Sequence, residues 1–229
     1  PAVARRLAGL AAAHAGVPVT WGEWSFDGGP LSLADEAPRL EFQLGYRGMS
    51  LRVGFDSFLQ ADLEAADRLY DATLDALDAR PGERVIDGYA GVGVVTCQLA
   101  RRGIRVTAVE AHPGAASDLR ANAARVAAED GEEVHVLELP AERMDWTRPR
   151  PHAVVVNPPR SGCPERVVDS IRRSAADRVV YVSCDPTTLA RDVRRFGDRW
   201  RVDDVRVFDL FPQTSHVETV ARLVRERAA

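Results

Sequence analysis

The sequence predicts an α/β fold: a mostly parallel, doubly wound sheet with a C-terminal antiparallel pair and a small β-containing segment at the N-terminus. After Gly82, strand-like apolar runs alternate with helix-like segments, which indicates parallel strands joined by helices on both faces. A glycine-rich turn, DGYAGVG, joins the first of these strands to a helix. Near the end, WRVDDVRVFDLFP and HVETVARLV resemble an antiparallel pair.

Residues 1–54 are predicted to form an N-terminal, partly β-rich segment, and residues 55–229 the main domain. Two strand-like runs, Leu40–Leu44 and Met49–Phe55, lie in the first part, and the second run has the period-two alternation of a half-buried strand. Ahead of them, Arg5–Gly16 loosely resembles a signal peptide, but its apolar spacing favours a short amphipathic helix. Because the chain begins without a methionine, we expect a fragment or a processed product.

Each element of the main domain follows from a local pattern. Apolar residues between Asp62 and Ala79 recur at helical spacing, and the turn Arg80–Gly82 ends that helix. Further helices are expected at VVTCQLARRG, closed by Gly103, at HPGAASDLRANAARVAAED and from about Pro186. Strands are expected at RVIDG, IRVTAVE, EVHVLEL, HAVVVNPP and RVVYVSC.

The composition is that of an ordinary globular protein, with 229 residues, 45% apolar and 28% charged residues, and a net charge of −4. No apolar run is long enough to cross a membrane, so we expect no membrane association. Three cysteines without CxxC spacing argue against a disulfide scaffold and against a metal site in this chain. They favour a reducing cytoplasm. All basic residues are arginines, which indicates a coding bias, and a monomer is expected.

The glycine turn is a candidate cofactor site. Gly91 and Gly93 allow the backbone to approach a ligand at a helix N-terminus, although Thr96 occupies the third glycine position of a dinucleotide motif. Glu110 ends the next strand, where a carboxylate can accept both hydroxyls of a ribose. Asp87, just before the glycines, suits a cationic ligand and would repel a pyrophosphate. This favours S-adenosyl-L-methionine over a dinucleotide; the alternative is a plain strand–helix turn.

A second candidate site follows the next parallel strand in NPPRSG. Its two prolines make a rigid, extended turn that can hold a flat base, with Asn157 and nearby carbonyls to orient it. An aromatic residue after the prolines would indicate methylation of an exocyclic base amine. Arg160 stands there instead, which weakens that alternative. The other interpretation is an ordinary loop that ends a strand.

Cys184 ends another strand-like run, in YVSCDPTTLA. Ligands of doubly wound sheets bind at the carboxyl ends of the strands, so Asp87, Glu110, Asn157 and Cys184 are expected to line one crevice. A helix beginning near Pro186 would lower the pKa of the Cys184 thiol and favour the thiolate. This pattern favours a nucleophile over an inert thiol.

Four stretches of the chain resemble the S-adenosylmethionine-dependent RNA 5-methyluridine methyltransferases, a family that modifies tRNA or ribosomal RNA. They are GFDSFLQAD, DGYAGVG, the pair of NPPRSG and VVYVSCDPTTLARD, and FDLFPQTSHVE. The resemblance covers roughly residues 45–225. It implies a Rossmann-like class I methyltransferase with S-adenosyl-L-methionine as cofactor and tRNA or rRNA as partner.

Carried over to this chain, the resemblance makes Cys184 the nucleophile and Glu218 the base. Cofactor contacts or pocket-shaping roles are implied for Gln60, Tyr89, Gly91, Gly93, Glu110 and Asn157. The chain departs from the family's usual residues at Leu59, Asp62, Gly88, Ala90, Asn157 and Asp185. These departures are expected to shift substrate choice or weaken activity.

The implied chemistry explains the residue types. C5 of uracil is a poor nucleophile, and attack of a thiolate on C6 would make C5 nucleophilic. A carboxylate in a partly buried pocket, with a raised pKa, can then remove the C5 proton. Phe58, Phe208 and Phe211 are candidates for stacking on an unstacked base, with core packing the alternative favoured for most of them. Methylation at another base position and non-catalytic RNA binding on the same scaffold stay as rival functions.

Overall fold

The computed structural model describes residues 40–43, 49–54, 57–58, 60, 63–129, 131–210, 213–214 and 217–226. The helix expected at Arg5–Gly16 lies outside these residues, as do Leu59, Asp62 and Phe211.

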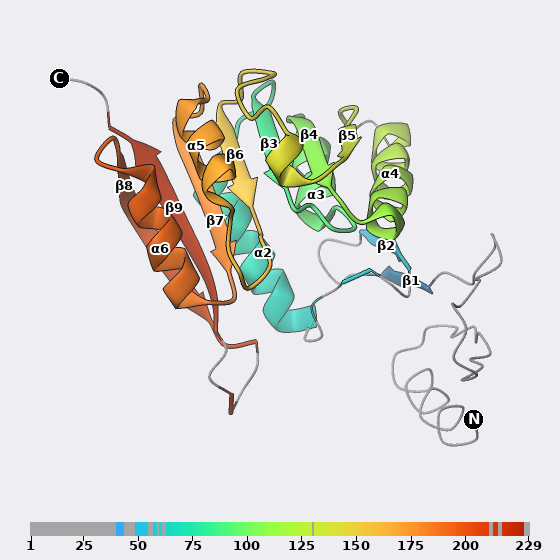
Figure 1. Cartoon of the computed structure of the whole chain (residues 1–229). Coiled ribbons are helices and arrows are strands. Elements are labelled where there is room, and N and C mark those ends of the chain that lie inside the picture. Colours follow the sequence, from blue (N-terminus) through green and yellow to red (C-terminus); the bar gives the residue numbers. More distant parts are fainter. Residues whose placement is uncertain are drawn as a thin grey trace, which may run out of the picture.

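The main sheet has seven strands in the order β5-β4-β3-β6-β7-β9-β8 (Figure 1). Strands β3 to β7 run parallel, whereas β9 pairs antiparallel with both β7 and β8. This confirms the predicted mixed sheet and its C-terminal antiparallel pair. The strands are β3 (Arg84–Gly88), β4 (Arg105–Glu110), β5 (His135–Glu138), β6 (Ala153–Val156), β7 (Arg178–Ser183), β8 (Trp200–Phe208) and β9 (Glu218–Arg225).

Helices cover both faces of the sheet (Figure 1). Helices α2 (Leu63–Leu77), α3 (Val94–Arg101) and α4 (Pro113–Ala128) pack on one face, and their apolar residues share a core with alternate strand positions such as Val180. Helices α5 (Glu165–Arg173) and α6 (Pro186–Phe196) pack on the other face, near the short 3-10 helix η1 (Ala141–Arg143). The sequence analysis had not identified α5, a nine-residue helix whose buried residues are Val167, Val168 and Ile171.

Helix α6 begins where the sequence predicted. Asp185 is its N-cap, and its carboxylate accepts hydrogen bonds from the backbone N–H groups of Thr187 and Thr188 at 2.8 and 3.0 Å. Pro186 occupies the first turn, where a missing N–H costs nothing. The departure at Asp185 therefore has a structural role, since a carboxylate caps a helix well.

The two strand-like runs of the N-terminal segment form strands β1 (Leu40–Gln43) and β2 (Ser50–Val53), and the structure shows that these pair antiparallel. The carboxylate of Asp118, on α4, accepts from the Gly54 N–H at 2.6 Å and the Ser57 hydroxyl at 2.9 Å. Because this contact attaches the segment directly to the main domain, the backbone that leads to Gln60 is held against α4. A domain boundary after residue 54 stays a prediction.

Within the described part of the chain, no helix combines the length and the apolar character needed to cross a bilayer.

Candidate active site

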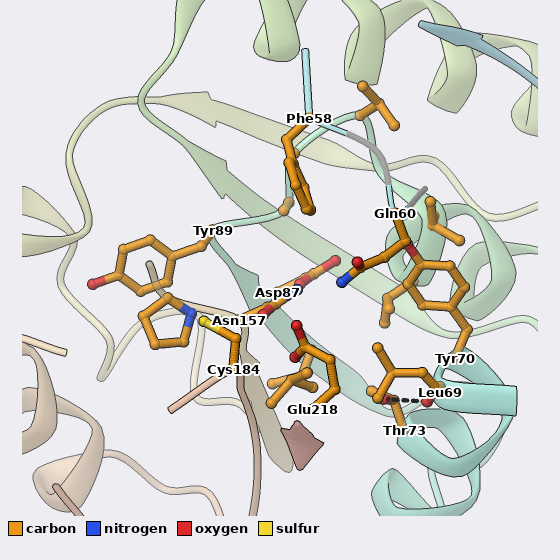
Figure 2. Close-up of a pocket in the computed structure, with 18 of the residues that line it drawn as sticks. Phe58, Gln60, Leu69, Tyr70, Thr73, Asp87, Tyr89, Asn157, Cys184 and Glu218 are labelled. Atoms are coloured by element: carbon orange, nitrogen blue, oxygen red, sulfur yellow. Dashed lines mark hydrogen bonds between the residues drawn. The ribbon is translucent and has the colours of Figure 1, made fainter. Parts of the chain in front are cut away.

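A cavity of about 510 Å³ opens at the carboxyl ends of β3, β4, β6 and β7 (Figure 2). Its volume lies within the ordinary range of small-molecule sites. Nearly all the residues singled out in the sequence line it, which confirms that they share one crevice. These are Gln60, Asp87, Tyr89, Gly91, Glu110, Asn157, Arg160, Cys184 and Glu218.

The glycine turn and Glu110 are joined by backbone hydrogen bonds. The Glu110 carboxylate accepts from the N–H of Gly91 at 2.8 Å and from the N–H of His112 at 2.7 Å, one bond to each oxygen. A Cβ at Gly91 would have no heavy atom within 4 Å, so the space beside this residue is open. Each carboxylate oxygen retains a second acceptor position, and Glu110 is therefore fixed in place while still able to receive ligand hydroxyls.

Gly93 has a different role, because it does not line this cavity. It is the N-cap of α3 with a φ of 89°. A Cβ there would lie 2.3 Å from a methyl carbon of Leu119, so the glycine permits close packing of α3 against α4. A contact between the Gly93 backbone and the cofactor, as the resemblance implies, stays a prediction.

Asp87 is 3% exposed and lies beside the cavity. The Thr96 hydroxyl donates to its carboxylate at 2.6 Å, so the residue that breaks the dinucleotide motif holds the acid in place. Burial raises the pKa of Asp87 from 3.8 to about 7, although the Thr96 hydrogen bonds act in the opposite direction. A cation bound in the cavity would favour the charged form of this carboxyl.

Gly88 provides room for a large aromatic side chain. A Cβ at Gly88 would lie 2.3 Å from a ring carbon of Trp146, which is fully buried and donates from its ring N–H to the carbonyl of Ala141 at 3.0 Å. Gly88 differs from the residue usual in the family, and the Trp146 ring occupies the space that a side chain at position 88 would take, beneath the glycine turn.

Cys184 and Glu218 are brought together by strand register. In the β7–β9 ladder the last pair joins Ser183 to Thr219. Cys184 follows β7 directly and Glu218 is the first residue of β9, so both flank this last pair. Both residues line the cavity and lie close together in Figure 2. The antiparallel insertion of β9 therefore supplies the carboxylate from a distant part of the chain.

The ionisation of this pair differs from the sequence prediction in one respect. Burial raises the pKa of Glu218, as expected, while Gln60 and Arg160 lower it. The pKa of the Cys184 thiol is also raised, first by burial and then by the neighbouring Glu218 charge, whereas Arg160 lowers it. The expectation that the helix N-terminus lowers this pKa is therefore wrong in direction: burial and the carboxylate outweigh it.

Gln60 brings a buried amide to the same place. It is 5% exposed, it lowers the pKa of Glu218, and the two side chains point toward one another in Figure 2. Its carbonyl oxygen has no hydrogen-bond partner among the described residues. A buried acceptor without a donor is costly, so this oxygen indicates a ligand that supplies one.

The aromatic residues in and near the cavity differ in their surroundings. Phe58 is 71% exposed at the cavity mouth, so the core-packing alternative is wrong for it. Phe208, by contrast, packs against the core of the α2 face. Tyr89 has a left-handed φ of 60°, and Figure 2 shows its ring directed away from Asp87 and Gln60. Its hydroxyl lies beside the Cys163 thiol, so Tyr89 forms a wall of the cavity.

Helix α2 contributes cavity residues that the sequence analysis had assigned only to helix packing. Leu69, Tyr70 and Thr73 line the side of the cavity nearest Glu218. Burial, with the Glu218 charge as the second cause, raises the pKa of Tyr70. The apolar periodicity identified the helix. It gave no sign that residues in the middle of this helix also line the cavity. Among the described residues, no group of three or more His, Cys, Asp or Glu side chains has a metal-binding arrangement.

Comparison with known sequences gives consistent matches. A family model described as tRNA (Uracil-5-)-methyltransferase matches residues 31–226. An uncharacterised RNA methyltransferase of Halalkalibacterium halodurans is 39% identical over 178 residues, covering 73% of this chain and 37% of that protein. Another, of Enterococcus faecalis, is 33% identical over 174 residues, covering 74% and 38%. The chain thus spans less than half the length of these relatives.

Solved structures agree with these matches. The Pyrococcus abyssi tRNA (uracil-54, C5)-methyltransferase, in complex with S-adenosyl-L-homocysteine, has a TM-score of 0.70 and 28% identity, covering 81% of this chain and 44% of that one. The magnesium protoporphyrin IX methyltransferase of Synechocystis, with bound S-adenosylmethionine, has a TM-score of 0.58 at 13% identity, covering 75% and 86%, and supports the fold alone. The fold is that of the class I S-adenosylmethionine-dependent methyltransferases.

Proposed function

Because the chain belongs to the tRNA (uracil-5-)-methyltransferase family, we propose that it catalyses methyl transfer from S-adenosyl-L-methionine to C5 of a uridine in RNA. The observation that carries this proposal is that Cys184 and Glu218 lie close together in the cavity that the glycine turn also lines. One side chain can add to a base and the other can remove a proton from it.

The cavity suits S-adenosylmethionine. Glu110 would accept the ribose hydroxyls, and the open space beside Gly91 would admit the ligand close to the backbone. Asp87 would face its positive charge, which suits a buried carboxyl that is otherwise costly to ionise. The unpaired carbonyl of Gln60 would accept from a ligand N–H. When bound, this cofactor supplies an electrophilic methyl group.

Cys184 would act as the nucleophile. Its thiolate forms a bond to C6 of the uracil, and the electron pair of the C5–C6 bond moves to C5 and the O4 carbonyl as an enolate. Arg160 would favour the thiolate, since its charge lowers the pKa of this thiol. C5 would then take the methyl group from the sulfonium, whose carbon–sulfur bond breaks, with S-adenosyl-L-homocysteine as the leaving group.

Glu218 would act as the base. Once C5 carries both a methyl group and a proton, the Glu218 carboxylate takes that proton, and the C6–sulfur bond breaks as the C5–C6 double bond returns. The raised pKa of Glu218 brings its basicity closer to what this step needs at neutral pH.

The substrate is proposed to be a structured RNA, with tRNA as the first candidate because the Pyrococcus abyssi neighbour is named for tRNA. The target uridine must leave its stack to reach Cys184. Phe58, exposed at the mouth, is positioned to stack on the displaced base or its neighbour. A cytoplasmic location and a monomeric state stay predictions.

Trapping the covalent intermediate tests this proposal. Glu218→Gln protein is incubated with tRNA or total RNA and S-adenosylmethionine labelled in its methyl group, and the products are separated on a denaturing gel. We expect labelled RNA held in a protein band, because the adduct forms and is methylated but cannot eliminate. Replacing Cys184 with Ala in the same protein should abolish the band.

The rival functions give different results in the same experiment. A methyltransferase that acts at another base position would methylate RNA without any band, and Cys184→Ala protein would retain activity. A non-catalytic RNA-binding protein would bind RNA with both residues replaced and would never transfer label.

A further inference from the structure

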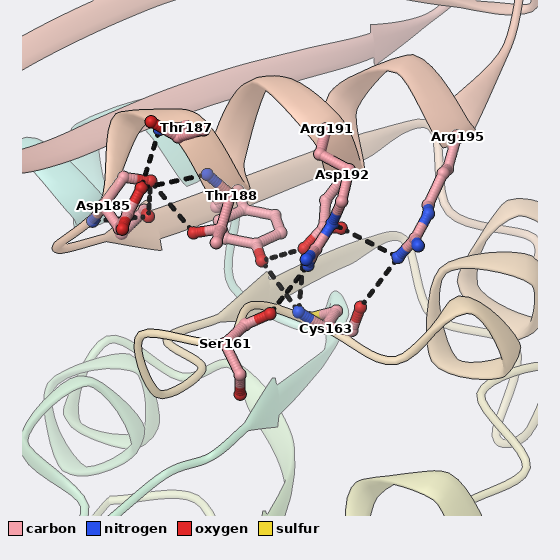
Figure 3. A network of polar contacts seen from close by, with 10 residues as sticks. Ser161, Cys163, Asp185, Thr187, Thr188, Arg191, Asp192 and Arg195 are labelled. Carbon is pink, nitrogen blue, oxygen red and sulfur yellow. Dashed lines mark hydrogen bonds and ion pairs between the residues drawn. The ribbon is translucent and has the colours of Figure 1, made fainter.

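Helix α6 carries a buried carboxylate, Asp192, at the centre of a network of polar contacts (Figure 3). Its side chain is 0% exposed. One oxygen accepts from the Cys163 N–H at 2.8 Å and from the Tyr181 hydroxyl at 2.7 Å. The other accepts from the guanidinium groups of Arg191 at 2.9 Å and Arg195 at 3.0 Å. The charge is thus fully hydrogen-bonded, as a buried carboxylate requires.

The segments joined by Asp192 carry the residues proposed for catalysis. Cys163 ends the loop that presents Asn157 and Arg160 to the cavity. Tyr181 lies in β7, just before Cys184. Helix α6 itself begins directly after the Cys184 turn. One carboxylate therefore connects the strand before Cys184, the helix after it and the loop that carries Arg160.

The same loop is built to approach this carboxylate closely. Gly162 has a φ of 75°, and a Cβ there would lie 2.4 Å from the Asp192 carboxylate and 2.6 Å from the Arg191 guanidinium. Arg191 also donates to the Ser161 carbonyl at 2.7 Å, and Arg195 to the Cys163 carbonyl at 3.3 Å. The carbonyl groups on either side of Gly162 thus accept hydrogen bonds from α6. Any side chain larger than that of glycine at position 162 would push the loop away from this helix.

We propose that Asp192 is a positioning residue that fixes the loop of Asn157 and Arg160 relative to Cys184. The inference rests on the proposed function for its catalytic meaning, but the positioning itself is testable without any methylation. The alternative is a buried ion pair that contributes to stability only. The two differ in whether losing Asp192 changes the surroundings of the Cys184 thiol.

The first measurement is the pH dependence of Cys184 alkylation by iodoacetamide, followed by peptide mass spectrometry. The charged groups facing this thiol are Glu218 on β9 and Arg160 on the loop. If Asp192→Ala releases the loop, Arg160 moves away, and the midpoint of the alkylation profile rises. The thiolate fraction at neutral pH should fall about three- to tenfold, since a nearby opposite charge strongly favours an ionised group.

A double-variant comparison separates positioning from other effects. In an Arg160→Ala background, Asp192→Ala should produce no further rise in the alkylation midpoint, because the group through which it acts is already absent. Gly162→Ala provides a second test, because it displaces the loop while the Asp192 carboxylate is still present. It should raise the midpoint of the Cys184 alkylation profile, as Asp192→Ala does. Asp192→Asn, which keeps an acceptor oxygen, should restore part of the wild-type profile.

The matched control is Glu83→Gln. Glu83 pairs with Arg178 at 2.7 Å near the opposite end of β3 and β7, and both side chains are largely buried. This substitution removes a partly buried ion pair of the same kind at a distance from Cys184. It should lower the thermal unfolding temperature but leave the alkylation profile unchanged.

Methylation kinetics then test the catalytic meaning. Asp192→Ala should lower kcat by as much as about 100-fold with little change in the KM for S-adenosylmethionine, because small displacements of reacting groups are costly. An unchanged alkylation profile in both Asp192→Ala and Gly162→Ala proteins would overturn the positioning proposal. If the profile shifts as expected while wild-type protein methylates no RNA, the positioning stands and the proposed function fails.

Discussion

The two halves of the cavity are held in different ways. The cofactor half, named for its proposed role, contains Asp87, Gly91 and Glu110 at the ends of the neighbouring parallel strands β3 and β4. Backbone N–H groups hold the Glu110 carboxylate, and the Thr96 hydroxyl holds Asp87. The nucleophile half, formed by Arg160, Cys184 and Glu218, comes from separate segments. It is fixed by strand register and by the side chain of Asp192.

This difference indicates how each half should respond to substitution. A site built from backbone groups over a short stretch of chain tolerates change elsewhere, and its own substitutions affect ligand affinity. A site assembled by side chains from distant segments depends on every segment, and its substitutions affect rate. We therefore expect substitutions in the cofactor half to change the affinity for S-adenosylmethionine, and substitutions in the nucleophile half to change the rate of methylation.

The largest effect is expected for Cys184→Ala. Loss of the nucleophile should reduce RNA methylation by more than about 1,000-fold, the scale seen when a covalent nucleophile is removed. The affinity for S-adenosylmethionine, measured by calorimetry, should stay within about twofold of wild type because the cofactor half is untouched. Substantial residual methylation would contradict the covalent mechanism.

Glu110→Ala should show the opposite pattern. Without the carboxylate, the Gly91 and His112 N–H groups lose their acceptor and a bound ribose loses its own. We expect the dissociation constant for S-adenosylmethionine to rise about 10- to 100-fold, since hydrogen bonds to a charged group are worth about 1.5–3 kcal/mol. At saturating cofactor, kcat should recover. A large loss of kcat that excess cofactor cannot restore would remove the distinction between the halves.

Within the nucleophile half, Glu218 and Arg160 should change the Cys184 thiol in opposite directions. The Glu218 charge raises the thiol pKa, so Glu218→Gln should lower it and increase the thiolate fraction at neutral pH several-fold. Arg160 lowers the pKa, so Arg160→Ala should raise it and decrease that fraction. Alkylation rates of Cys184 across pH measure both. Shifts of the same sign would show that the two charges do not control this thiol.

The smallest effect on ligand binding is expected from Asp87. Since its pKa in the folded protein is raised from 3.8 to about 7, ionising it costs stability, and the free energy of unfolding should fall as pH rises between these values. A bound cation favours the ionised form, so affinity for S-adenosylmethionine should increase a few-fold as pH rises through about 7. Asp87→Asn should flatten both dependences. S-adenosylhomocysteine, which lacks the sulfonium charge, provides the control and should show a weaker pH dependence.

Much of the fold and the membership of the cavity were predictable from local pattern. Glycines, prolines and strand-ending polar residues are short-range signals, and the rule that ligands bind at carboxyl ends of strands assembled Asp87, Glu110, Asn157 and Cys184 correctly. The predicted helix from Pro186 was also correct.

The rest depended on long-range contacts that a single sequence does not display. The position of β9 between β7 and β8 sets the register of Glu218, and no residue spacing encodes it. The thiol pKa was predicted in the wrong direction because a helix N-terminus is visible in the sequence, whereas burial and an opposing carboxylate are not. Asp192 was overlooked for the same reason: only the folded chain shows what it contacts.

The position of β9 has a consequence for the order in which activity can arise. Chains are synthesised from the N-terminus, and β9 is the last described strand to be made, yet it lies inside the sheet between β7 and β8. The glycine turn and Cys184 are complete well before Glu218 arrives. Under the proposed mechanism, a nascent chain without β9 would hold the thiol but lack the base that releases RNA, so early contact with RNA would leave the polypeptide attached to it. Insertion of β9 would then be the step that makes the proposed catalyst able to turn over.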